Sequence, residues 1–97
     1  MWCCSPTDGD GLWYTNEYPE DMFFSCLVAM TERYKNHPHV AGIDLRNEPR
    51  PAHGVMNAWG GNNPKTDYAT AMEKAGNMIL EANSDILVII EVNNNVV

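Results

Sequence analysis

The stretch "GIDLRNEPRP", residues 42–51, runs from apolar strand residues into a polar tip and then into a proline. We predict a short strand over Val40 to Leu45, with Asn47 and Glu48 just beyond its end. Proline disfavours helical backbone in the residue that precedes it. Pro49 therefore predicts an extended Glu48 whose carboxyl group points in a fixed direction.

The polar tip suggests chemistry, because in parallel α/β folds the reactive side chains gather beyond the carboxyl ends of the strands. Among apolar and aromatic neighbours Glu48 is expected to lose hydration and to have a raised pKa, which suits a proton donor. Asn47 offers both a donor and an acceptor to a substrate hydroxyl. The alternative is a plain turn in which Arg46 or Arg50 forms a salt bridge to Glu48.

A helix is predicted before this strand, over Pro19 to Lys35, after one long loop over residues 1–18. Pro19 suits the first helical position, and the two carboxylates that follow it suit the positive end of the helix dipole. The expected apolar face of this helix comprises Phe23, Phe24, Leu27, Val28, Met30 and Tyr34.

A second helix and strand are predicted after a long connection rich in glycine and proline, a kind of loop that is usually functional. Thr66 is expected to cap the helix, with Asp67 beside the dipole, and Asn83 to end it in a left-handed turn. The apolar stripe of the helix comprises Tyr68, Met72, Ala75 and Ile79. The unbroken apolar run Ile86 to Ile90 is typical of a strand that is covered on both faces in a parallel sheet.

The order of elements is therefore loop, helix, strand, long loop, helix, strand, which indicates one α/β domain over residues 1–97. Two strands cannot cover Ile86 to Ile90 on both faces. We therefore expect neighbouring strands that this chain does not contain.

Composition excludes several classes of partner. Thirteen acidic against six basic residues give a net charge of −7, which repels nucleic acid and anionic membranes. No apolar run is long enough to span a bilayer, and the N-terminus does not resemble a signal peptide, so the localisation is not indicated. We expect no metal and no cofactor: His37 and His39 lie in a turn without a third ligand, and "GDG" and "GG" lack the context of a phosphate loop.

The remaining cysteines, histidine and aromatic residues have plain structural interpretations. Three unpaired thiols are expected at Cys3, Cys4 and Cys26, with Cys26 as a small buried apolar group. His53 is expected at the surface, and Asp44 is expected to have a structural role with an arginine or backbone partner. Two tryptophans are expected to fill the top of the core, namely Trp2 and Trp13. For Trp59 sugar stacking and core packing are equally open.

The segment "HPHVAGIDLRNEP" resembles the fourth-strand signature of glycoside hydrolase family 5, whose hallmark is Asn-Glu-Pro at the strand tip. "DGLWYTNEYPEDMF" and "ERYKNHP" are similar to the family's third helix and its lead-in, and "KAGNMILEANSDILVIIE" to its fourth helix and fifth strand. The terminal "EVNNNVV" departs from the Glu-Gly that commonly follows this strand. The resemblance implies a partial (β/α)8 TIM barrel, from about the third helix to the fifth strand.

The resemblance also implies an activity: a retaining glycosidase that hydrolyses a β-linked glucan or mannan. It implies that Glu48 is the proton donor, that Asn47 binds the sugar 2-hydroxyl and that Trp59 lines a sugar subsite. The nucleophile of the family lies on a seventh strand, outside this chain. Glu91, at the tip of the last strand, is interpreted as a hydrogen-bond acceptor that fixes a loop. Two alternatives remain, a non-catalytic carbohydrate-binding pseudoenzyme and an inactive truncated product.

Overall fold

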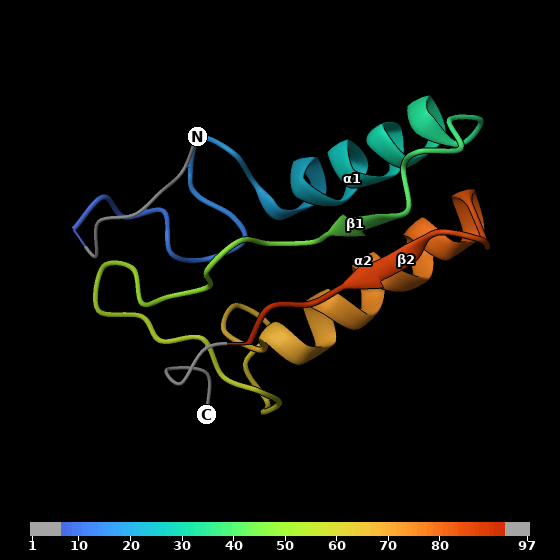
Figure 1. Ribbon diagram of the computed structural model, residues 1–97. Helices are drawn as coiled ribbons and strands as arrows, with labels where there is room; N and C mark the ends of the chain where they lie inside the picture. The colour runs from blue at the N-terminus through green and yellow to red at the C-terminus, as the bar shows by residue number, and fades with distance from the viewer. Residues whose placement is uncertain (1–6, 93–97) are drawn as a thin grey trace.

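A computed structural model describes residues 7–92 of the chain and contains two helices and two strands (Figure 1). In chain order these are α1 (Glu20–Tyr34), β1 (Gly42–Asp44), α2 (Tyr68–Ala82) and β2 (Leu87–Ile89). The predicted order of elements is confirmed, although both strands are shorter than predicted.

The two strands form a parallel sheet in which Gly42 pairs with Leu87 and Asp44 with Ile89. Both strand arrows in Figure 1 point toward the side where the loop before α1 and the long connection before α2 gather. A further backbone hydrogen bond, from the Leu45 amide to the Ile89 carbonyl at 3.0 Å, continues the pairing beyond β1. The sheet therefore delivers the two strand tips side by side to the loop end of the molecule.

Helix α2 supplies the most continuous part of the core. Its predicted stripe is confirmed, since Tyr68, Met72, Ala75 and Ile79 are all at most 1% exposed. The predicted caps are wrong at both ends. Asp67, not Thr66, accepts the Thr70 amide at 3.1 Å, because the Thr66 hydroxyl instead donates to a carbonyl within its own turn. Asn83 is extended, with φ −151°.

Helix α1 buries a face that is rotated from the predicted one. Phe24, Leu27 and Thr31 are its buried residues, whereas Met30 and Tyr34 are 45% and 42% exposed. Thr31 is tolerated on this buried face because its hydroxyl donates to the Leu27 carbonyl of the same helix at 2.9 Å, so the hydroxyl has a hydrogen-bond partner.

The loop before α1 enters the core through Trp13, which is 1% exposed, as predicted. The Trp13 indole N–H donates to Glu20 Oε1 at 2.8 Å, and its ring packs edge-on to Tyr14 and tilted against Tyr68. A ring of this size, buried between the loop and α2, ties the lead-in to the second half of the chain. Trp2 lies outside the described residues.

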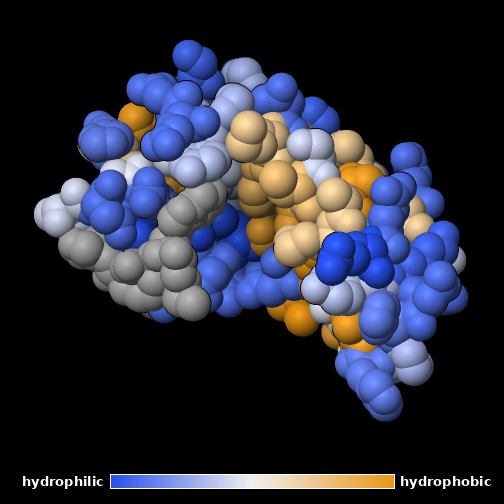
Figure 2. Space-filling model, turned by 90° about the horizontal axis from the view of Figure 1, so that it is seen from above, coloured by the Kyte–Doolittle hydropathy of each residue, from blue (hydrophilic) through white to orange (hydrophobic). Residues whose placement is uncertain are grey.

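The sheet is open on one side, as expected for two strands that cannot cover the run Ile86 to Ile90 on both faces. Ile86 is buried, but Leu87 is 61% and Ile89 43% exposed, because the described part of the chain places no further strand or helix over them. Figure 2 shows the apolar surface gathered in the middle of one face, with polar residues around it. A groove of about 430 Å³ runs between α1 and β1, and its lining includes Met22, Phe23, Cys26, Met30 and Leu45.

Candidate functional site

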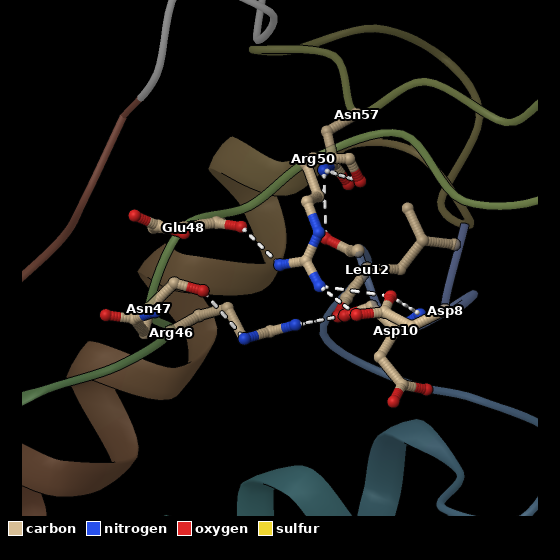
Figure 3. A network of polar contacts seen from close by, with 9 residues as sticks. Asp8, Asp10, Leu12, Arg46, Asn47, Glu48, Arg50 and Asn57 are labelled. Atoms are coloured by element: carbon tan, nitrogen blue, oxygen red, sulfur yellow. Dashed lines mark hydrogen bonds and ion pairs between the residues drawn. The ribbon is translucent and has the colours of Figure 1, made fainter. Parts of the chain in front are cut away.

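The candidate site lies where the chain leaves β1 (Figure 3). Leu45 and Pro49 are buried, whereas the side chains of Asn47 and Glu48 between them are exposed. The buried residues on either side anchor the segment, and the two polar side chains project from it. This is the strand-tip arrangement that the sequence predicts.

Arg46 is buried at 6% exposure and holds three main-chain carbonyls at once. Its Nε donates to Leu12 O at 2.9 Å, one terminal nitrogen donates to Asn47 O at 2.7 Å, and the other donates to Asp10 O. Burial, and then the nearby Arg50 guanidinium, lower the pKa of Arg46. The planar guanidinium thus joins the lead-in loop to the strand tip, which is the kind of multiple contact that only arginine makes.

Arg50 makes a second connection between the same two segments. One terminal nitrogen of its guanidinium contacts both carboxylate oxygens of Asp8, at 3.0 and 2.8 Å, and the other donates to the Glu48 carbonyl at 3.3 Å. The Arg50 amide donates to Gly11 O at 2.9 Å. A Cβ on Gly11 would lie 2.2 Å from the Arg50 carbonyl oxygen, so only glycine allows these two segments of the chain to approach this closely.

Two expectations about Glu48 are corrected. Its φ is +45°, in the left-handed region and not extended, and its amide donates to Glu91 Oε2 at 2.8 Å. The tertiary hydrogen bond from its N–H and a local one from Arg50 to its carbonyl hold a conformation that the preference before proline does not predict. The side chain is exposed, because the described residues place no apolar cover over it.

The alternative of a salt bridge to Glu48 is not observed in residues 7–92. Arg46 and Arg50 both bind main-chain oxygens, and the ion pair formed there joins Arg50 to Asp8. In Figure 3 the Glu48 carboxyl group points away from the Arg50 guanidinium. The carboxyl group is therefore presented to solvent at the loop end of the molecule.

Asn47 and Trp59, the two predicted sugar contacts, occupy different parts of this end. Asn47 borders the apolar groove beside α1. Trp59 lies in the long connection, is 49% exposed, and packs at a tilt on Tyr68 with ring centroids 6.3 Å apart. Tyr68 in turn donates its hydroxyl to Glu91 O at 3.2 Å. Trp59 is thus linked to the strand tips indirectly, by its contact with Tyr68 at the start of α2.

Glu91 accepts a hydrogen bond from the Glu48 loop, so its interpretation as a loop-fixing acceptor is confirmed. The Glu48 amide first, and then the neighbouring Asp44, lower the pKa of Glu91, whereas burial and then Glu91 raise the pKa of Asp44. Asp44 is exposed and lies near Glu91 and Arg46, and its structural role stays a prediction.

The other singled-out residues lie away from this site or at the surface. Cys26 is exposed on α1 and not buried, because the buried face of the helix is rotated. His37, His39 and His53 are exposed, as expected. Cys3 and Cys4 lie outside the described residues.

Residues 7–92 contain neither a metal-binding cluster nor a membrane-spanning helix. No group of three or more histidine, cysteine or acidic side chains there could hold a metal ion. Neither helix in this range has the length and apolar character needed to cross a bilayer.

The polar network that supports the strand tip was not predicted from the sequence. Asp8, Asp10 and Leu12 lie more than thirty positions before the arginines that they bind, so no local pattern joins them. The sequence signals for this network were Gly11, where two segments of the chain cross, and the two arginines that flank Asn47 and Glu48.

A family model described as cellulase (glycosyl hydrolase family 5) matches residues 7–95. The chain is 45% identical over 86 residues to an endoglucanase of Paenibacillus polymyxa, covering 88% of this chain and 21% of that protein. It is 39% identical over 80 residues to the major extracellular endoglucanase of Xanthomonas campestris, covering 82% and 16%. The chain thus spans about a fifth of the length of these curated relatives.

Solved structures give the same result. The catalytic domain of the Xanthomonas campestris endoglucanase matches with a TM-score of 0.78 and 35% identity, over 84% of this chain and 22% of that one. An endocellulase from Pyrococcus horikoshii, solved in complex with cellotetraose, matches with a TM-score of 0.76 and 32% identity, over 86% and 24%. The fold is therefore part of a (β/α)8 TIM barrel. On these matches the chain belongs to the cellulase family, glycosyl hydrolase family 5.

Proposed function

We propose that Glu48 is the proton donor of a retaining glycosidase that hydrolyses β-linked glucans, and that Asn47 and Trp59 contact the sugar. One observation carries this proposal. Glu48 lies just past the carboxyl end of a parallel strand, with its carboxyl group exposed and its main chain held at both the N–H and the carbonyl. The relatives that are endoglucanases favour a glucan over a mannan as the substrate.

The reaction uses Glu48 twice. Protonated Glu48 donates its proton to the glycosidic oxygen as the C–O bond breaks, while a second carboxylate attacks the anomeric carbon. The Glu48 carboxylate then takes a proton from the water that hydrolyses the glycosyl-enzyme. The second carboxylate must lie about 5–5.5 Å from the first, and we assign it to a barrel strand outside this chain.

Glu91 is not assigned as this nucleophile, although it lies beside Glu48. Its carboxylate already accepts the Glu48 amide and lies near a second carboxyl group, that of Asp44. We therefore expect no hydrolysis by the 97-residue chain alone.

The test is to graft residues 7–92 in place of the corresponding segment of the Paenibacillus polymyxa endoglucanase, which supplies the rest of a barrel. Glu48→Gln should lower the turnover of cello-oligosaccharides by about 10²–10⁴-fold. The glycosylation step on an aryl glycoside with an acidic leaving group should lose less, because that leaving group needs no proton. Glu81→Gln, an exposed change on α2, is the matched control. Equal activity of the Glu48→Gln and unaltered grafts would refute the assignment.

A second candidate role is carbohydrate binding without cleavage, which the half-exposed ring of Trp59 favours. Titration of the unaltered chain with cello-oligosaccharides should shift tryptophan fluorescence, and Trp59→Phe should abolish that shift. Trp13 is buried and provides the constant background signal. No shift at millimolar sugar would eliminate this role.

A further inference from the structure

The backbone of Glu48 has a conformation that its own sequence does not explain. Among the described residues it is one of two non-glycine positions with positive φ, the other being His53. Side chains disfavour this region, so an external contact must select it. The residue concerned carries the carboxyl group that the proposed function uses.

The contact comes from the neighbouring strand. Glu91 lies two positions beyond the end of β2, and its Oε2 accepts the Glu48 amide at 2.8 Å. The register that pairs Asp44 with Ile89 places the two strand tips next to each other. The Tyr68 hydroxyl donates to Glu91 O at 3.2 Å and so fixes the main chain of Glu91 from α2.

A second carboxyl group, that of Asp44 on β1, lies near the carboxylate of Glu91. The Glu48 amide first, and then Asp44, lower the pKa of Glu91, whereas burial and then Glu91 raise the pKa of Asp44. These directions agree with an ionised Glu91 that accepts the Glu48 amide. The groups that face Glu91 are then the Glu48 amide from the loop after β1 and the side chains Asp44, Arg46 and Tyr68.

We propose that Glu91 is a positioning residue for Glu48: its carboxylate accepts the Glu48 amide, holds the Glu48 main chain in the left-handed conformation and thereby directs the Glu48 carboxyl group. We call the hydrogen bond between the Glu48 amide and the Glu91 carboxylate the tether. Its importance for hydrolysis rests on the proposed function. The tether itself does not, because it joins two groups of this chain in the absence of substrate.

The test is an NMR titration of the unaltered 97-residue chain. The chemical shift of an amide proton that donates to a carboxylate changes when that carboxylate is protonated. The Glu48 amide proton should therefore move upfield as the pH is lowered and Glu91 becomes protonated. Glu91→Ala should abolish this response and raise the hydrogen-exchange rate of the Glu48 amide by about tenfold to a hundredfold. Glu91→Gln, which retains an acceptor, should restore part of the protection. Glu81→Gln is the control for the charge change.

The titration requires no substitution, so unfolding of a variant does not remove the test. The proposal is overturned if the Glu48 amide of the unaltered chain exchanges at the random-coil rate, or if its shift does not follow Glu91. The proposed function is tested separately by hydrolysis in the graft. There, Glu91→Ala should lower kcat with little change in KM, and Glu91→Gln should recover part of kcat. If the Glu48→Gln graft is fully active while the Glu91–Glu48 hydrogen bond persists, the proposed function is rejected and the positioning role of Glu91 stands.

Discussion

Arg46 shows how much a single residue contributes to the shape of the strand tip. It is buried, and its guanidinium binds carbonyls that belong to two segments far apart in the chain. If a buried carbonyl loses its hydrogen-bond donor, its desolvation is no longer compensated and the folded state is destabilised. The geometry of the tip therefore depends on a side chain that takes no part in the proposed chemistry.

We expect Arg46→Lys to destabilise the chain by about 1–3 kcal/mol, because a single ammonium cannot reach all three carbonyls in the plane of the guanidinium. Urea denaturation at neutral pH measures the effect. Arg33→Lys, on an exposed position of α1, is the matched control and should change stability by less than about 0.5 kcal/mol. Equal midpoints for the two variants would contradict the role given to Arg46.

At this scale the sequence predicted positions better than conformations. Asn47 and Glu48 were placed at the strand tip because the apolar run ends there and proline follows. The left-handed backbone of Glu48 was not predicted, because it depends on a hydrogen bond from the Glu48 amide to the carboxylate of Glu91, which lies 43 positions later. The pairing of Arg50 with Asp8 is likewise a tertiary contact without a local signal.

At the scale of elements, periodicity predicted the buried face of α2 but not that of α1. In α2 most of the apolar residues fall on one face, so spacing identifies the face that packs. Helix α1 is apolar around much of its circumference, and its buried face includes Thr31. A threonine that bonds its own helix does not appear in an apolar pattern.

The core role of α2 leads to a direct comparison of two adjacent positions. Ile79→Ala should cost about 2–5 kcal/mol, because Ile79 is fully buried and truncation leaves a cavity. Leu80→Ala should cost less than about 1 kcal/mol, since Leu80 is 42% exposed. Thermal or urea denaturation followed by circular dichroism measures both. A cost for Leu80→Ala equal to that for Ile79→Ala would show that α2 does not pack by this face.

The N-terminal cap of α2 should make stability depend on pH. The Thr70 amide, and then the Thr70 hydroxyl, lower the pKa of Asp67 below its ordinary value of 3.8. Its contribution to stability is therefore complete above that value and is lost as the pH falls through the lowered pKa. Asp67→Asn should reduce stability at neutral pH, and the two curves should converge toward about pH 2.

Urea denaturation at a series of pH values checks this expectation. Thr66→Ala is the control, because the Thr66 hydroxyl donates to the Asn63 carbonyl and does not cap the helix. A gap between the Asp67→Asn and unaltered chains that stays constant down to the lowest pH would rule out the charged cap.

For the whole molecule, the described residues divide into a packed half and an open half. Trp13, Tyr68 and Met72 are almost completely buried between the loops and the helices. The open half is the apolar groove beside α1 together with the exposed side chains of β2, among them Leu87. The sequence predicted this open half, because an unbroken apolar strand indicates cover on both faces and two strands cannot supply that cover.

Exposed apolar side chains on a two-stranded sheet favour contact between copies of the chain. We therefore expect the isolated chain to sediment faster as its concentration rises. Leu87→Lys should suppress this, because it places a charge at the most exposed apolar residue of β2. Ser84→Lys adds the same charge in the exposed turn before the strand and should not suppress it. Sedimentation velocity over a range of concentrations separates the cases. If Ser84→Lys suppresses association as well as Leu87→Lys does, net charge and not the open apolar face controls it.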